Sequence, residues 1–284
     1  TDSYYRNDVF SVLGYRKITR RLPFQTGKRG LYGIPSLNMT ARDFFMTTNF
    51  AYSRKSDAWL YVLPKRVASP ELSMFCSHLL GELETRRNQM EDPYTFRGIR
   101  EYAYGDTYGK INWKATAKAS KLMVNMYGYT SEQRVRILLN LETNIMVKTE
   151  YLQEMSIRMA GMIAEYFLQH KVSVELVSNG IDCMTGACER VEAGMSMEHG
   201  ETIDKYLARI KENAGIDAFM QMVDTEIQQM EEPITYVIIS PYYKEDLLLK
   251  LDYMHKNNPE LHMVVPYYDI QDKTGWRGYM QGVE

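Results

Sequence analysis

The chain has 284 residues, of which 45% are hydrophobic and 25% charged, and this composition excludes a chain that is disordered over most of its length. The 34 basic and 36 acidic residues give a formal net charge of -2, so no overall electrostatic field would attract nucleic acid or an anionic membrane surface. The three cysteines fit neither a disulfide framework nor a zinc-ligand pattern, which favours a reducing compartment.

The first 66 residues have the pattern of β structure. Aromatic and β-branched residues alternate with polar ones over residues 10–20, 30–37, 42–52 and 58–63. Alternation with a period of two is typical of strands that bury one face. We therefore predict a β-rich N-terminal domain over residues 1–66, folded as a small sandwich or barrel.

Residues 67–132 are predicted to hold a helix and a compact turn. Apolar residues recur at helical spacing over residues 70–88, and residues 90–96 are predicted to be a loop. Residues 99–104 alternate as a strand, Gly105-Asp106 is a turn signal, and Asp106 is a good cap for a helix near residues 110–121. Residues 122–127 are predicted to be a second strand. We expect this whole segment to pack on the domain that follows it.

Residues 133–284 alternate between strand and helix. Nearly continuous apolar runs cover residues 135–141, 172–177, 234–240 and 261–265, and helical periodicity covers the stretches between them, most clearly residues 148–170. Apolar strands that alternate with helices indicate a parallel sheet covered on both faces. We therefore predict a three-layer α/β domain.

A stretch of special residue types begins at residue 98, and it carries a family resemblance. Its glycines, aromatic residues and paired charges resemble the signature of the Domain of Unknown Function 58 family, which is itself similar to von Willebrand factor A proteins. The signature residues are Gly98, Arg100, Tyr102, Gly105, Asp106, Trp113 and Lys114. Asn112 and Lys118 depart mildly from the usual Asp and Arg. The resemblance extends upstream to Arg29 and so covers nearly the whole chain; it implies a von Willebrand A-like (Rossmann-like) fold for residues 133–284.

The resemblance also implies a cellular setting. Relatives usually carry a pair of membrane helices ahead of this region and are often encoded with AAA+ ATPases of the MoxR type. The chain itself begins with Thr1 and has no apolar run of the roughly 18 to 20 residues that cross a bilayer. The expectation is a membrane-anchored parent protein, with this portion on the cytoplasmic face of the membrane and an AAA+ ATPase as partner.

Von Willebrand A domains hold magnesium through an Asp-x-Ser-x-Ser motif after the first strand, and the resemblance places that motif at Glu142, Asn144 and Met146. The thioether of methionine is a poor magnesium ligand. A later strand ends in Ser240-Pro241, where relatives usually place a Ser-Asp pair. We predict a degenerate edge that binds no metal, with an intact site as the alternative. The five histidines are far apart in sequence, so each is interpreted as a surface or core residue.

The charged residues of the signature allow three interpretations. Arg100 and Asp106 are predicted to lock the turn by a bidentate ion pair, helped by packing of Trp113. Partner docking and acid-base catalysis remain as alternatives.

We predict from these features a non-enzymatic protein-protein interaction domain, an adaptor or assembly factor that works with the ATPase, without a cofactor and without nucleic acid. The alternative is a metal-dependent hydrolase that uses Glu101, Asp106 and Glu142. Loops at the carboxyl ends of parallel strands are where an α/β domain varies its contacts. The predicted partner-binding residues are Glu142, Asn144, Ser240, Tyr242 and Tyr243.

Overall fold

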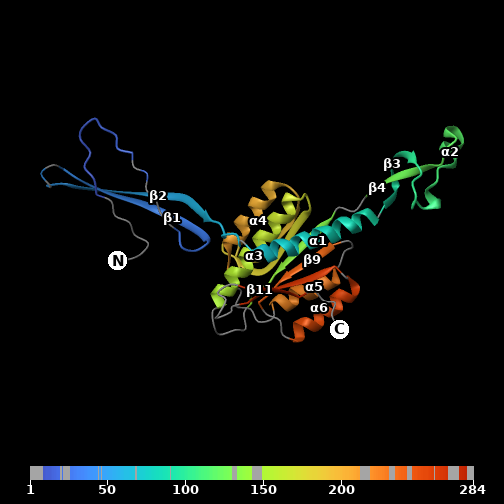
Figure 1. The fold of residues 1–284 in the computed structure, drawn as a ribbon. Helices are drawn as coiled ribbons and strands as arrows, with labels where there is room; N and C mark the ends of the chain where they lie inside the picture. The colour runs from blue at the N-terminus through green and yellow to red at the C-terminus, as the bar shows by residue number, and fades with distance from the viewer. Residues whose placement is uncertain are drawn as a thin grey trace.

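The structure is a computed structural model. It describes residues 9–19, 21, 26–43, 45, 47–67, 69–89, 91–129, 133–142, 149–211, 218–229, 234–241, 245–258, 260–267 and 275–279. Figure 1 shows a central α/β domain from which two arms extend on opposite sides. None of the described helices is long and apolar enough to span a membrane.

The central domain is built on one mixed sheet. Its strands are β5 (Arg134–Leu139), β6 (Ser173–Asp182), β7 (Cys188–Gly194), β8 (Ile210–Lys211), β9 (Ile234–Ile239), β10 (Leu261–Tyr267) and β11 (Gly275–Tyr279). The order across the sheet is β11-β10-β9-β5-β6-β7, and β8 pairs with β6. Neighbouring strands among β10, β9, β5 and β6 are parallel, whereas β7, β8 and β11 pair antiparallel. The carboxyl ends of the parallel strands therefore meet at one edge.

Helices cover both faces of this sheet. On one face lie α1 (Pro70–Gln89), α3 (Thr149–Gln169) and α4 (Met197–Arg209), and on the other lie α5 (Ala218–Gln228) and α6 (Glu245–Asn257). Strand β5 shows how the layers form, because Ile137 packs in the cluster with α1, α3 and α4, whereas Leu138 packs in the cluster with α5 and α6. Figure 1 shows the sheet between these two helix layers. The predicted α/β architecture is confirmed.

The first arm is a two-stranded antiparallel ribbon of β1 (Gly30–Arg42) and β2 (Asn49–Val62). The predicted sandwich or barrel is not confirmed, because the described strands of this part form one ribbon, and residues 10–19, predicted as part of a strand, form none. The run predicted as a strand over residues 42–52 covers the end of β1, the connection between the strands and the start of β2, whereas the run at 58–63 falls almost wholly in β2. The polar residues Ser53, Arg54 and Lys55 pair with β1 and keep β2 continuous. At its base the ribbon is held to the α/β domain by Arg29, whose Nη1 donates to the carbonyl oxygens of Leu207 (2.6 Å) and Ile210 (3.0 Å).

The second arm carries the signature residues. It contains β3 (Glu91–Glu101), the short 3-10 helix η1 (Tyr108–Lys110), α2 (Trp113–Ala119) and β4 (Met123–Tyr129), and β3 pairs antiparallel with β4. Figure 1 shows this arm beyond the end of α1, away from the sheet. Residues 91–96, predicted as a loop, belong to β3. The predicted helix is shorter because Asn112 caps it and Ser120, at φ 55°, ends it in the left-handed conformation.

Candidate functional site

Polar side chains meet where β5, β6 and β9 end, at the carboxyl edge of the sheet. Asn140 donates from Nδ2 to Ser240 Oγ (2.9 Å), and Asn179 donates from Nδ2 to Asn140 Oδ1 (3.0 Å). Asn179 Oδ1 in turn accepts the amide of Leu141 (2.8 Å). All three polar side chains are buried. The polar groups of this part of the edge therefore form hydrogen bonds with one another. Ser240, which was predicted to contact a partner, has no exposed surface.

Glu142 is used at the same edge as a helix cap. Its Oε1 accepts the backbone amide of Phe219 (2.9 Å), in the first turn of α5. Amides in the first turn have no intrahelical acceptor, and a carboxylate there also meets the positive end of the helix dipole. The side chain predicted to replace a metal-binding aspartate therefore has a structural partner. Asn144, Tyr242 and Tyr243, the other predicted partner-binding residues, lie outside the described residues.

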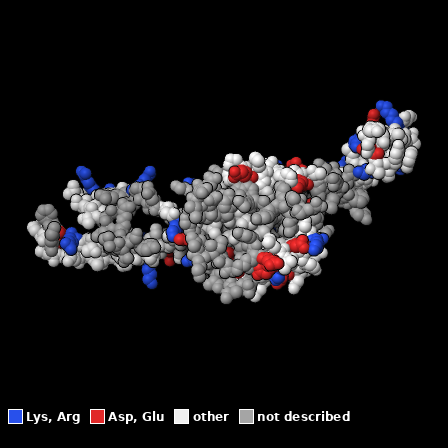
Figure 2. Space-filling model, turned by 60° about the horizontal axis from the view of Figure 1, so that its bottom comes forward, with Lys and Arg blue, Asp and Glu red and all other residues white. Residues whose placement is uncertain are grey.

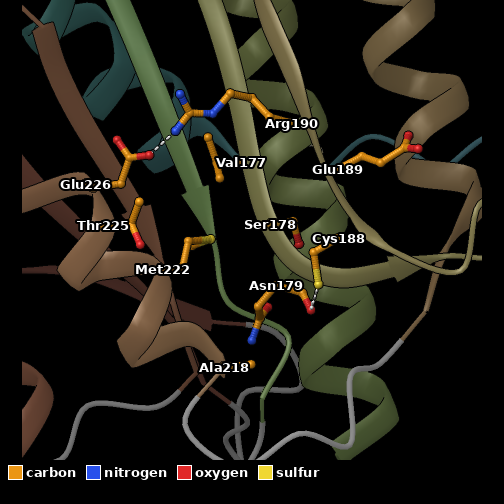
Figure 3. A pocket seen from close by; sticks show the side chains of 10 residues that line it. All are labelled: Val177, Ser178, Asn179, Cys188, Glu189, Arg190, Ala218, Met222, Thr225 and Glu226. Atoms are coloured by element: carbon orange, nitrogen blue, oxygen red, sulfur yellow. Dashed lines mark hydrogen bonds and ion pairs between the residues drawn. The ribbon is translucent and has the colours of Figure 1, made fainter. Parts of the chain in front are cut away.

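A pocket of ≈ 230 Å³ opens beside this edge, between α5 and the strands β6 and β7. Figure 3 shows Ser178 and Asn179 on one wall, Cys188 and Arg190 on the next, and Met222 on the helix. Cys188 donates from its thiol to the carbonyl of Asn179 (3.3 Å), which narrows one end of the pocket. Thiol, amide and thioether groups line the pocket beside paired charges.

Those charges belong to a largely buried network in which Arg190 and Glu226 line the pocket and Arg136 and Glu175 lie behind them. Arg136, on β5, donates to Glu175 (2.7 Å) and to Glu226 (2.5 Å), and Arg190 pairs with the same two carboxylates. The side chains of Arg136, Glu175 and Glu226 are 6%, 4% and 1% exposed. Burial acts to lower the pKa of Arg136, but its hydrogen bond to Glu175 and the charges of Glu226 and Glu175 outweigh burial and raise it. Two cations and two anions balance, so the network holds α5 on the sheet.

In the signature arm, Arg100 and Asp106 form the predicted bidentate pair. Arg100 donates from Nη1 to Asp106 Oδ2 (2.7 Å) and from Nη2 to Oδ1 (2.6 Å). Asp106 Oδ2 also accepts the amide of Ala103 (2.8 Å), and Gly105 has a φ of +104°, a conformation that favours glycine. The hydrogen bonds from Arg100 and from the Ala103 amide lower the pKa of Asp106. Asp106 thus closes the turn before it and does not cap the helix after it.

Several aromatic residues of the arm are exposed, and among them Trp113 contradicts its predicted packing. Trp113, predicted to pack on the turn, is 69% exposed at the start of α2, and Lys114 next to it is also exposed. Tyr102 stacks on Tyr108 with ring centroids 6.1 Å apart. Gly98 lies opposite Met126 in the β3–β4 pair. The tip of the arm therefore presents aromatic surface to solvent.

The three carboxylates of the hydrolase alternative do not meet. Glu101 pairs with Lys121 (3.0 Å), Asp106 pairs with Arg100, and Glu142 caps α5. Glu101 and Asp106 belong to the end of β3 and the turn after it, in the second arm, whereas Glu142 follows β5 of the central sheet, and Figure 1 shows these two parts of the molecule apart. Catalysis by general acid and base requires such groups within reach of one substrate.

Comparisons of the chain with protein-family models, with curated proteins and with solved structures gave no match.

Proposed function

We propose that this chain is a non-enzymatic protein-interaction domain, and that the β1–β2 ribbon is its main docking element. The observation that carries the proposal is an exposed apolar face on the outer half of the ribbon. Leu37, Met39, Phe50 and Tyr52 are between 48% and 62% exposed. Figure 2 shows that most of the described surface of the ribbon is neither acidic nor basic, with isolated Lys and Arg side chains standing out from it.

The strand register puts these side chains on one face. Met39 pairs with Tyr52 and Ala41 pairs with Phe50, and residues two apart on a strand share a face. The residues between them, such as Asn38 and Ser53, are polar and point to the other face. A ribbon of two strands is marginal by itself in water. An amphipathic ribbon of this kind is stabilised when another protein surface covers its apolar face.

The identity of the partner rests on the family resemblance. The signature residues of the second arm support membership of the Domain of Unknown Function 58 family, and the three-layer sheet supports a von Willebrand A-like fold. We propose on this basis a membrane-anchored parent protein with this domain at the cytoplasmic face. The partner is then an AAA+ ATPase of the MoxR type, for which this domain acts as adaptor or assembly factor.

Photo-crosslinking in the native host tests the proposal. A crosslinking amino acid at Tyr52, on the apolar face, should capture the ATPase, whereas the same amino acid at Ser53 on the polar face should not. In the Tyr52 background, Phe50→Asp should abolish capture. The matched variant Ala51→Asp places the same charge one residue away on the other face and should leave capture intact. Equal capture from both faces, or capture insensitive to Phe50→Asp, contradicts the proposal.

A further inference from the structure

Three potential metal ligands lie together at the amino edge of the sheet, opposite the edge described above. Glu82 comes from α1, Glu260 precedes β10, and His262 is the second residue of that strand. Their ligand atoms all lie within 4.8 Å of one another, and all three residues are half-buried. Within the described residues this is the one group of three or more His, Cys, Asp and Glu side chains close enough to share an ion.

His262 has a nitrogen that needs a partner. Its side chain is 12% exposed, and Nε2 has neither solvent contact nor a hydrogen-bond partner among the residues that the structure describes. The nearest carboxylate oxygen, Glu82 Oε2, is 3.6 Å away, which is too long for a hydrogen bond. Phe75 lies edge-on to the ring, with centroids 6.1 Å apart, and limits its movement. A buried polar atom without a partner destabilises a fold. An ion bound between His262 and the two carboxylates would give Nε2 a partner and so remove this destabilisation.

A second histidine, His78, lies next to the carboxylate of Glu82. His78, one turn before Glu82 on α1, has Nδ1 3.3 Å from Glu82 Oε1. Glu82 therefore has one oxygen toward His78 and the other toward His262. Contacts of this kind orient the ligands of protein metal sites.

We propose that Glu82, Glu260 and His262 bind a divalent transition-metal ion, with zinc as the best match. Two carboxylate oxygens and one imidazole nitrogen suit zinc better than magnesium or calcium, which prefer oxygen ligands throughout. Zinc bonds of about 2.0 to 2.2 Å in a tetrahedron place ligand atoms roughly 3.3 to 3.6 Å apart. Side-chain movements of about 1 Å bring the present arrangement to that spacing. The two carboxylates also neutralise the ion.

The position of the site indicates a structural role. Leu79 and Leu83 hold α1 in the core beside Glu82, and the second arm begins after the end of this helix. An ion bound by Glu82, Glu260 and His262 joins α1 directly to β10. It would therefore fix the point at which the helix leaves the sheet and carries the second arm outward (Figure 1). This role is independent of the proposed ribbon contact.

Calorimetric titration of the full chain, stripped of metal with a chelator, tests the site with zinc, manganese and magnesium salts. We expect one equivalent of zinc to bind with a micromolar or lower Kd, and magnesium to bind at least 100-fold more weakly. Glu82→Gln should weaken zinc binding by 10-fold or more, because it replaces a charged ligand with a neutral amide. Glu84→Gln, an exposed change on the same helix, should leave it unchanged.

Cobalt provides a second readout that reports the ligands directly. Cobalt added to the wild-type chain should give visible absorption typical of a four-coordinate site, and His262→Gln should alter that spectrum. Circular dichroism checks that each variant is folded; if His262→Gln unfolds, Glu82→Gln and Glu260→Gln carry the test. The proposal is overturned if zinc binds with less than half an equivalent, or if zinc affinity is the same in the wild-type, Glu82→Gln and Glu260→Gln chains.

Discussion

Replacing Arg136 by methionine should destabilise the α/β domain far more than the same replacement of its neighbour Arg190. Arg136 is the most buried cation of the network at the pocket, and it bonds to Glu175 and Glu226, which are almost fully buried. Methionine fills a similar volume but carries no charge. The variant leaves two buried carboxylates to share the single guanidinium of Arg190.

The expected loss follows from the burial of the groups. Removing one partner of a buried ion pair costs about 3 to 5 kcal/mol, because the remaining charge has lost both water and its partner. Arg190 is 31% exposed, so solvent screens its charge, and Arg136 would still hold both carboxylates in its absence. We therefore expect Arg190→Met to cost only about 1 kcal/mol. Adding Glu175→Gln and Glu226→Gln to Arg136→Met should recover most of the lost stability, since no buried carboxylate then lacks a counter-charge, and the remaining charge of Arg190, which is 31% exposed, is screened by solvent.

Urea unfolding followed by circular dichroism at 222 nm measures these differences. Tryptophan fluorescence is less suitable, because two of the three tryptophans, Trp59 and Trp113, lie on the arms, and only Trp276, in β11, belongs to the α/β domain. The reasoning is refuted if Arg136→Met shifts the free energy of unfolding by less than about 1 kcal/mol, well below the range for a broken buried pair. It is also refuted if Arg190→Met destabilises the chain as much as Arg136→Met does.

The remaining predictions concern the turn, two glycines and the cysteines. Arg100→Ala or Asp106→Ala should speed hydrogen exchange of the amides between them without moving the urea midpoint of the α/β domain, because the pair lies in the arm; a shifted midpoint would contradict this. Gly81→Ala, in open space on α1, should stabilise the chain by about 0.5 to 1 kcal/mol. Gly180→Ala should destabilise it by about 1 to 3 kcal/mol, because the new Cβ would meet a leucine methyl at 2.7 Å and a backbone oxygen at 3.1 Å; equal urea midpoints for both variants would contradict the packing argument. Burial raises the pKa of the Cys76 thiol to about 12, so a thiol reagent at pH 8 should modify the two exposed cysteines and reach the third only in denaturant.

The α/β half was predictable because its strands are buried on both faces. Such strands are continuous apolar runs, and β5 and β9 stand where those runs predicted them. Strands β7, β8 and β11 were missed. β7 is largely exposed at the edge of the sheet, so its sequence carries no apolar run. Buried strands can be recognised in the sequence by their apolar runs, whereas the formation of an edge strand depends on pairing with a neighbour that the sequence does not identify.

The ribbon shows a different limit of the sequence. Alternation correctly predicted strands with one apolar face, but a ribbon and a sandwich have the same alternation. The number of strands depends on which segments pair. Lys55 lies between two runs that were predicted as separate strands, and its pairing with Ser36 makes the residues on either side of it parts of one strand, β2. The apolar face was therefore assigned to a core within this chain, although the structure leaves Phe50 and Tyr52 exposed.

The candidate sites were harder to predict than the fold. The Arg100–Asp106 pair was predicted because the partners are only six positions apart, with the turn glycine Gly105 between them, and local geometry brings them together. Glu82, Glu260 and His262 were not predicted as a group, because α1 and β10 are far apart in sequence and meet only when the helix packs on the sheet. Convergence of that kind is a property of the tertiary fold.

The two faces considered for partner binding differ in what they offer energetically. At the carboxyl edge, Asn140 and Asn179 already have protein partners for their hydrogen bonds, so a new contact there must replace bonds that exist. On the ribbon, burying the half-exposed side chains of Leu37, Met39, Phe50 and Tyr52 would contribute about 1 kcal/mol each, or about 4 kcal/mol together. Association of two proteins costs about 4 to 15 kcal/mol in lost freedom of movement. The apolar face alone therefore gives a weak complex, and a stable one must also engage the backbone edge of the ribbon or the exposed aromatic residues of the second arm.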